Sequence, residues 1–583
     1  MQRKTIIFPL LAILVTASMI FTSACGPSTP TTTPTTTTPT TTKPTTTTPT
    51  TFAPTGPQEI TLNLAGEVVT IDPNRASWSN ERSVMMQVFD GLLAFNPDLS
   101  LAPMCAQAIP TVANGGISAD GKTYTIKLKP NVTWSDGTKV TAKDFAFSIK
   151  RLFDPDLASE YASFYFNIVG GEAYYGAASK TAAEKTALKD AIGVRAIDDA
   201  TLEIKLTAAL PTFTQLLALW PVYPIRQDMV EKYGEKWAQP ADASGAMPYY
   251  IGNGPFVMKE WVQQDHYTFV RNEKYWGTKP YLTKITYKEI TDANVALAAY
   301  KNNELDQSGV PGGTEKATMN DPVLSKEIVR YPQLTTYAIQ FNQLMGEPYT
   351  NKKFRQAVSC AIDRVAFVDK VRGGVGKAAV SWIPPGMPGY DVNLGKEWEF
   401  NPTKAKQLLA EAGYPDGKGL PEFKFEIANT GTNPTLAAFL QEQMKTNLGI
   451  NLTADLMESK SYSALYNDKK FHSGFTGWGA DYPDPDNWLP QLYGTGAGNN
   501  KISYSNPAFD ALCKQGLAEL DNTKRLQIWA QAQAIVVEDQ SRVFIFNRET
   551  FALKKPWVKG QITTGMDGQI PGDMFLRSVY IQK

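Results

Sequence analysis

Apolar and polar residues alternate in two stretches of the chain, near residues 125 and 204. The apolar positions are Tyr124, Ile126 and Leu128 in the first stretch and Leu202, Ile204 and Leu206 in the second. Successive side chains of a β-strand point to opposite faces, so a period of two indicates a strand with one buried face. We therefore predict a half-buried strand in each stretch.

Four other segments carry apolar residues at helical spacing. Three of them follow Thr141, Asn401 and Asn506, whose side chains can accept hydrogen bonds from the first turn of a helix. The fourth covers residues 354–362. Strands that alternate with helices in this way predict an α/β architecture for the body of the protein, residues 58–583.

The first residues have the pattern of an export signal. Arg3 and Lys4 precede an apolar run over residues 5–21, and small residues lead to Cys25. This arrangement looks like a lipobox, although Thr22 stands where bacterial lipoproteins usually carry leucine. We predict a lipoprotein signal peptide over residues 1–24 and a lipid on the Cys25 sulfur that anchors the chain to the cell membrane, outside the cytoplasm. An uncleaved membrane anchor is the alternative, and it places the body on the same side.

Residues 25–57 consist of the lipidated cysteine and a segment that is almost wholly Thr and Pro. Such a segment cannot bury a core, so we expect an extended linker that holds the body away from the membrane. The remaining cysteines, Cys105, Cys360 and Cys513, are too widely spaced for a disulfide framework or a zinc pattern. Cys513 falls on the apolar face of a predicted helix and is expected in the core.

Composition and motifs exclude several classes of function. The 57 basic and 57 acidic side chains give a formal net charge of zero, so nucleic acid is not an expected partner. The chain has two histidines, His266 and His472, and neither is spaced for a shared metal ion. Nucleotide-binding loops and a GxSxG nucleophile motif are missing from the sequence. We predict a binding protein rather than an enzyme, with no metal or cofactor.

Polar and aromatic residues are densest at positions 474–488, and three interpretations of this cluster are open. Its carboxylates could bind calcium, but prolines interrupt them and the glycine and distal glutamate of an EF-hand loop are missing. Asp484 and Asp486 could simply form turns, because Asp-Pro is common in loops. The third interpretation is a site for an extended peptide.

The peptide interpretation depends on small residues beside large aromatic ones. Gly477 and Gly479 would expose backbone groups for strand-like pairing with a ligand. Asp481 would meet a cationic amino terminus. The aromatic residues expected at the ligand are Trp478, Tyr482 and Trp488.

Motifs along the whole body resemble solute-binding protein family 5, the oligopeptide- and dipeptide-binding lipoproteins of ABC transporters. The matching segments are Asp72 and Pro73, residues 88–93, 134–151, 232–237, 253–256, 271–276, 354–364, 405–414, 478–485, 507–510 and 555–558. Coincidence across so many spaced motifs is implausible.

The resemblance implies a two-lobed α/β fold of the periplasmic-binding-protein type, cluster C, with a hinge between the lobes and an extra inserted subdomain. The main lobe, domain I, would comprise residues 58–94, 231–312 and 540–583. The inserted subdomain, domain II, would cover residues 95–230, and the opposing lobe, domain III, residues 313–539.

The resemblance also implies how a ligand is held. In peptide-binding members the acid that corresponds to Asp481 holds the amino terminus of the peptide, beside the backbone of Gly477 and Gly479. Enterobacterial members have an arginine for the ligand carboxylate three residues before the tryptophan, and this chain has Phe475 there. Recognition of the carboxyl end is therefore not predicted from the sequence.

The expected function is capture of short peptides by a monomeric receptor that closes on its ligand and docks on a membrane permease driven by cytoplasmic ATPases. Two alternatives stay open. Relatives of the fold carry other solutes, such as oligosaccharides, nickel chelates, haem or opines, and a protein on a Thr/Pro stalk could instead be a surface adhesin.

Overall fold

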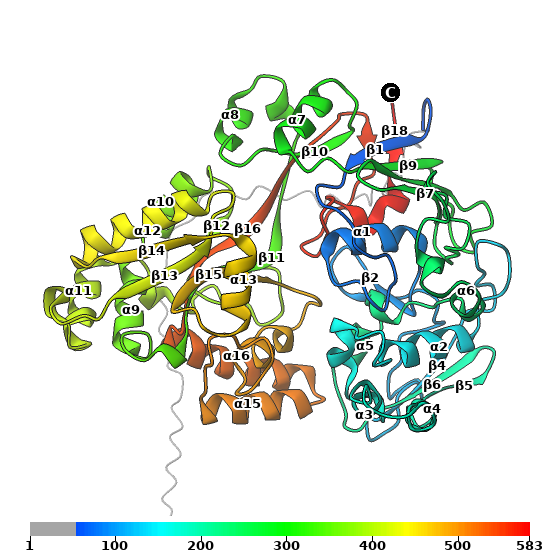
Figure 1. Cartoon of the computed structure of the whole chain (residues 1–583), viewed down its shortest axis with the longest axis horizontal. Coiled ribbons are helices and arrows are strands. Elements are labelled where there is room, and N and C mark those ends of the chain that lie inside the picture. Colours follow the sequence, from blue (N-terminus) through cyan, green and yellow to red (C-terminus); the bar gives the residue numbers. More distant parts are fainter. Residues whose placement is uncertain (1–53) are drawn as a thin grey trace, which may run out of the picture. The chain divides into compact units, whose positions relative to one another are not determined.

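An eleven-stranded mixed sheet runs through the body of the protein (Figure 1). The structure is a computed structural model that describes residues 54–583, which form one unit. The predicted signal peptide, the lipidation site Cys25 and the linker up to residue 53 lie outside the described residues. Strand order in the sheet is β14-β13-β15-β11-β16-β10-β1-β9-β8-β7, and β12 pairs with β16.

Two groups of strands build this sheet. One lobe contains β1 (Glu59–Asn63), β7 (Phe256–Val262), β8 (His266–Arg271), β9 (Lys284–Lys288) and β10 (Gln307–Gly309). The other contains β11 (Ile328–Phe341), β12 (Lys377–Ala378), β13 (Phe423–Ala428), β14 (Leu452–Met457), β15 (Ser473–Gly479) and β16 (Arg542–Lys554).

The long antiparallel strands β11 and β16 connect the two lobes. They pair from Ile328↔Leu553 to Gln340↔Arg542, with a bulge between Pro332 and Thr336. The far end of β16 also pairs with β10 of the first lobe. The boundary that the sequence places at residue 540 thus falls just before a strand that serves both lobes.

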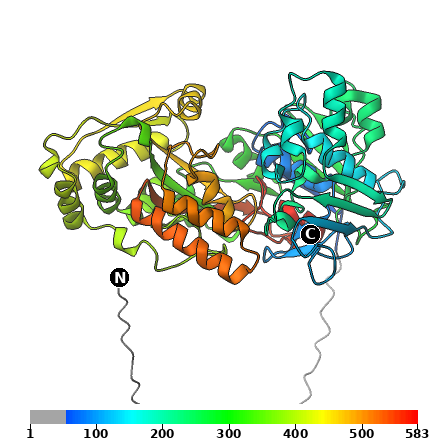
Figure 2. The ribbon, with the colours of Figure 1, turned by 90° about the horizontal axis from the view of Figure 1, so that it is seen from below.

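Helices cover the strands of each lobe (Figures 1 and 2). The first lobe has α1 (Ser79–Val88), α6 (Gln227–Tyr233) and α7 (Ala293–Lys301), and the short α8 (Glu315–Asn320) comes just after the boundary predicted at residue 312. The other has α9 (Lys352–Ala361), α10 (Arg364–Val371), α11 (Pro402–Glu411), α12 (Asn433–Leu448), α13 (Ser459–Asn467), α14 (Pro490–Tyr493), α15 (Pro507–Ala518) and α16 (Asn522–Asp539).

A separate three-stranded antiparallel sheet lies within the segment predicted to be inserted. Its strands are β4 (Thr123–Lys127), β6 (Thr201–Lys205) and β5 (Val194–Asp198), and the helices of the same segment are α2 (Ala142–Leu152), α3 (Gly171–Tyr175), α4 (Ala182–Asp190) and α5 (Phe213–Leu216). A further small pair joins β2 (Leu93–Phe95) to β3 (Leu101–Pro103), and another joins β17 (Val558–Lys559) to β18 (Tyr580–Ile581).

The elements predicted from local patterns are confirmed. Both alternating stretches are strands, β4 and β6, and their alternate apolar residues are buried. Thr141 caps α2, where its backbone N–H and hydroxyl both donate to Asp144. Asn401 and Asn506 accept hydrogen bonds from the first turns of α11 and α15.

Cys105, Cys360 and Cys513 are buried free thiols. Burial raises the pKa of Cys513 to about 12, so this side chain stays uncharged and packs as a small apolar group. Within residues 54–583 no group of three or more potential ligand side chains is arranged to hold a metal ion. The helices of that same range are all too short or too polar to cross a membrane.

Candidate functional site

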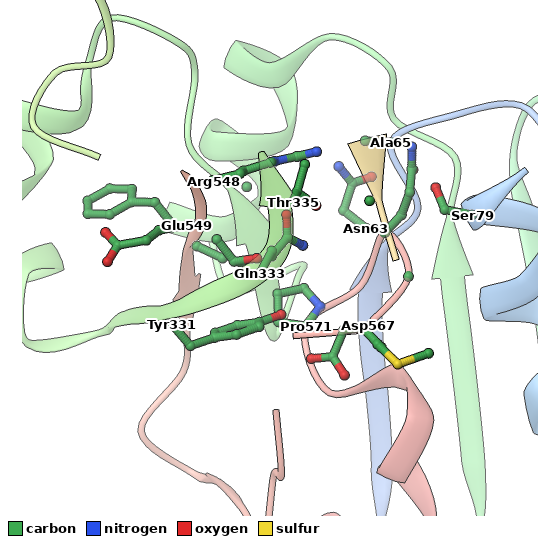
Figure 3. Close-up of a pocket in the computed structure, with 18 of the residues that line it drawn as sticks. Asn63, Ala65, Ser79, Tyr331, Gln333, Thr335, Arg548, Glu549, Asp567 and Pro571 are labelled. Atoms are coloured by element: carbon green, nitrogen blue, oxygen red, sulfur yellow. The ribbon is translucent and has the colours of Figure 1, made fainter. Parts of the chain in front are cut away.

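A pocket of about 620 Å³ lies between the lobes (Figure 3). This volume is within the range that binding sites for small ligands usually have. Both lobes and the inserted segment contribute to its wall, including Asn63, Ser79, Arg82, Tyr161, Trp220, Thr335, Gly479, Asp481 and Arg548. Because its lining comes from all three regions, a movement of the lobes would change the shape of the pocket.

The carboxylate of Asp481 stands in the wall of this pocket, just after β15 ends. The hydroxyl of Tyr161 donates to its Oδ1 over 3.0 Å, and the side-chain amide of Asn487 donates to its Oδ2 over 3.0 Å. Asn487 also accepts a hydrogen bond from the backbone N–H of Asp481 at 3.0 Å. The carboxylate is thereby held in one orientation by groups from two different parts of the chain.

Burial raises the pKa of Asp481 above its ordinary value, while the hydrogen bonds from Asn487 and Tyr161 and the charge of Arg82 act in the opposite direction. No ion pair includes this carboxylate within residues 54–583, and Arg82, whose charge acts on it, donates its hydrogen bond to the carbonyl of Met566. A partly desolvated acid without an ion-pair partner favours a cation in the pocket.

Glycine is required at position 477 for packing. A Cβ there would lie 2.9 Å from ring carbons of Tyr337, closer than real Cβ contacts allow. Gly479 is exposed and lines the pocket. On the side of β15 away from β11, β13 pairs only at Gly474, so residues 475–479 have no strand partner along that edge among the described residues.

The three aromatic residues predicted to contact the ligand do not line this pocket. Trp488 is fully buried and packs on Trp382, with ring centroids 5.0 Å apart. Tyr482 is 3% exposed. Trp478 is half-buried and donates from its indole N–H to Asn487 over 3.2 Å. In this structure the ring of Trp488 belongs to the core, and its contact with ligand side chains stays a prediction.

Asp484 and Asp486 are buried, which the interpretation as simple turn residues did not anticipate. Arg525 of α16 binds both oxygens of Asp484 at 2.7 and 2.6 Å. The hydroxyl of Thr212, in the inserted segment, donates to Asp486 over 2.7 Å. These carboxylates fix the loop after β15, and neither lines the pocket.

Sequence reasoning missed Tyr161, Asn487 and Arg548. Asn487 lies within the cluster at 474–488, and its spacing from Asp481 was the one available signal. Tyr161 is 320 positions from Asp481 in the chain, and Arg548 lies on a strand with no motif around it. No local pattern connects Tyr161 or Arg548 to the site.

Comparison with known proteins agrees with this architecture. Residues 107–500 match the family model described as bacterial extracellular solute-binding proteins, family 5 Middle. The chain belongs to this family. The match confirms the resemblance found in the sequence motifs, and membership of a family of solute-binding proteins agrees with the expectation of a binding protein.

Relatives of this family 5 protein are similar over nearly their whole length. The periplasmic oligopeptide-binding protein OppA of Salmonella typhimurium is 31% identical over 90% of this chain and 93% of the relative. The oligopeptide-binding protein OppA of Bacillus subtilis is 30% identical over the same shares. The solved structure of the Escherichia coli murein tripeptide binding protein MppA superposes with a TM-score of 0.73, at 28% identity over 91% of this chain and 99% of that chain. The predicted two-lobed fold is confirmed.

Proposed function

We propose that this family 5 protein captures short peptides in the pocket between its lobes and delivers them to the permease of an ABC importer. Binding, rather than a chemical reaction, is its role. The relatives named as oligopeptide- and murein-tripeptide-binding proteins support the ligand class. The observation that carries the proposal is the Asp481 carboxylate, which is oriented by two hydrogen bonds and has no ion-pair partner among the described residues.

In this proposal Asp481 binds the ammonium group of the peptide. The exposed backbone at Gly479 and the unpaired edge of residues 475–479 pair with the peptide main chain as an added strand would. The hydroxyl of Tyr161, from the inserted segment, donates to the same carboxylate, so two regions of the protein meet at the group that binds the amine. Gly477 acts indirectly, because it lets β15 approach the ring of Tyr337.

We also propose that the protein works as a monomer tethered outside the cytoplasmic membrane by a lipid on Cys25, with the Thr/Pro segment as its spacer. The division into domain I, the inserted domain II and the opposing domain III belongs to the same proposal. Its support is the separate sheet of the inserted segment and the two strands, β11 and β16, that link the lobes.

Calorimetric titration with tetra-alanine and its N-acetylated form tests the amine assignment. Acetylation removes the positive charge, so we expect it to weaken binding to the wild type by about 10- to 100-fold, the effect of a hydrogen bond between charged groups. The Asp481→Asn variant should discriminate little between the two peptides. Asp455→Asn, an exposed acid on β14, serves as the matched control. Equal affinities of the wild type for both peptides would overturn the assignment.

A further inference from the structure

The chain enters the described body beside its own C-terminus. Thr55 forms a β-bridge with Gln582, and its hydroxyl donates to the carbonyl of Lys583 over 2.9 Å. The side-chain amide of Gln58 donates to the carbonyl of Ile581 over 3.0 Å. In Figure 1, β1 and β18 accordingly lie next to the C-terminal end of the chain. The segment that would carry the lipid is therefore attached at this end of the first lobe.

Aromatic side chains surround this point of entry. Tyr281 is 54% exposed, and its ring meets that of Tyr580 on β18 with centroids 5.7 Å apart. Thr283, two positions after Tyr281, donates its backbone N–H to the carbonyl of Gln58 over 2.7 Å, which keeps Tyr281 close to the entering chain. Trp557, directly before β17, is half-buried. Rings of this kind, apolar with one polar group, are enriched where a membrane meets water.

Lysine side chains lie among these rings. Lys559 of β17 stands opposite Tyr580 in strand register. The ammonium group of Lys583 lies 4.8 Å from the ring centre of Trp557. Burial, followed by the charge of Lys559, lowers the pKa of Lys554 at the end of β16, so these two lysines lie close enough to repel each other. Positive charge is thus concentrated where the chain enters.

The protein compensates this charge only in part. No carboxylate forms an ion pair with Lys554, Lys559 or Lys583 within residues 54–583, and the first of them donates to a backbone carbonyl instead. Glu59 is an exposed acid at the start of β1, beside Lys284 in strand register. The terminal carboxylate of Lys583 adds a second negative charge. Two carboxylates do not balance four lysines, so this end of the lobe suits an anionic partner.

We propose that an entry surface at this end of the lobe rests on the anionic headgroups of the membrane to which the chain is tethered. The surface consists of Tyr281, Trp557, Lys559, Tyr580 and Lys583. The inference rests on the lipid anchor of the proposed function and adds to it which end of the body faces the lipid. The ammonium groups meet lipid phosphates, and the rings enter the layer between headgroups and acyl chains. The five residues do not line the peptide pocket, so contact with lipid leaves the pocket lining unchanged.

The linker and the entry surface have separate tasks in this arrangement. An extended Thr/Pro segment covers about 3.1 Å per residue, so it limits how far the body moves from the lipid but does not choose the face that meets it. The tether also keeps the surface at a high effective concentration beside the membrane. A contact that is weak for the free protein is therefore sufficient to orient the tethered one.

Sedimentation with lipid vesicles tests the entry surface. The parent protein for this test is the mature chain from residue 25, with Cys25→Ser to prevent lipidation. Vesicles of phosphatidylcholine and phosphatidylglycerol in equal parts serve as the anionic membrane, and pure phosphatidylcholine serves as the neutral one. Each lysine at an anionic lipid surface contributes about fivefold to binding, so the Lys559→Gln, Lys583→Gln double variant should bind the anionic vesicles about 25-fold more weakly than the parent. High salt should remove this difference.

Matched controls separate this surface from general effects of charge. The Lys406→Gln, Lys418→Gln double variant removes two exposed lysines of the opposing lobe and should leave vesicle binding nearly unchanged. Tyr281→Ser should weaken binding to both kinds of vesicle, because the ring contributes without a charge. Tyr390→Ser, at an exposed position of the opposing lobe, should have no such effect.

Two outcomes overturn the inference. If the parent binds anionic vesicles no better than the Lys559→Gln, Lys583→Gln variant does, the lipid assignment is wrong and the surface is left for a protein partner. If the control on the opposing lobe loses as much binding, net charge rather than this surface is responsible.

Titration of the same proteins with tetra-alanine keeps the two proposals apart. A parent protein that binds vesicles through the entry surface but binds no peptide contradicts the peptide function alone. A parent protein that binds tetra-alanine but binds no vesicles contradicts the entry surface alone. Unchanged peptide affinity in the lysine variants shows that they fold, so a loss of vesicle binding in them reports on the surface itself.

Discussion

Single carboxylates set the chemistry of the pocket and of the loop beside it. Asp481 forms no ion pair in the part of the chain that the structure describes, and it accepts hydrogen bonds from Tyr161 and Asn487. Asp484, three positions later, is neutralised by Arg525. The two acids are close in sequence but differ in environment, so the first is available to a ligand and the second stabilises the fold.

The affinity for a peptide with a free amine should fall as the pH is lowered. The pKa of Asp481 is raised in the free protein, and a bound ammonium group would lower it because it stabilises the carboxylate. Binding therefore releases protons near the raised pKa, and affinity is lost as the pH falls through it. Titrations from neutral pH to about pH 4 measure this, and Asp481→Asn should flatten the profile. A wild-type affinity that stays constant over this range would contradict the assignment.

Asp486 should make the protein less stable as the pH rises. Burial, followed by the charge of Asp484, raises the pKa of Asp486 to about 8. The folded state therefore holds a proton that the unfolded state has released, and stability falls as the pH rises from the unfolded value of about 4 toward the folded one. Asp486→Asn keeps an acceptor for Thr212 but cannot ionise.

Melting temperatures of the wild type and Asp486→Asn test whether Asp486 lowers the stability of the protein as the pH rises. We expect the variant to gain stability relative to the wild type as the pH rises, and the two curves to converge in acid. Asp455→Asn controls for the loss of one exposed charge. A constant difference between the curves across the pH range would show that Asp486 is ionised in the folded protein.

At the scale of elements, α16 holds the loop that carries the site. The guanidinium of Arg525 is buried and binds both oxygens of Asp484. Through this pair, α16 fixes the segment that runs from Asp481 to Asn487. The site is thus positioned by a helix that contributes no residue to the pocket wall.

Replacing Arg525 with methionine should destabilise the protein by about 3 to 5 kcal/mol, because Asp484 would remain buried and unpaired. Urea denaturation measures the loss. The double variant Arg525→Met, Asp484→Asn removes the unpaired buried charge and should recover part of the lost stability, so the effects of the two substitutions are not additive. A loss below about 1 kcal/mol for Arg525→Met would show that water reaches Asp484.

The elements predicted correctly are those whose signals lie within a few residues of one another in the sequence. Thr141, Asn401 and Asn506 cap helices through hydrogen bonds to residues two or three positions away, and such signals are visible in the sequence. The burial of Trp488 was not predicted, because its partner Trp382 lies 106 positions away and leaves no local pattern in the sequence. The contact of Tyr161 with Asp481 and the pairing of β11 with β16 also join residues that lie far apart in the sequence, so no local pattern predicts them.

At the scale of the whole molecule, the pocket is assembled by connections between lobes. β11 and β16 run as one pair from the opposing lobe to β10 of the first. Tyr161 and Thr212 of the inserted segment donate to Asp481 and Asp486 of the opposing lobe. Bending of the two shared strands would open or close the pocket.

Native mass spectrometry of the purified chain, followed by denaturation and identification of the released molecules, tests the central claim most directly. The account predicts a ladder of short peptides that disappears from the Asp481→Asn variant. A single sugar, a haem or a metal chelate as the released ligand would contradict the peptide function while leaving the fold intact. A protein that carries no ligand and binds no member of a peptide library would contradict the claim that it captures a solute.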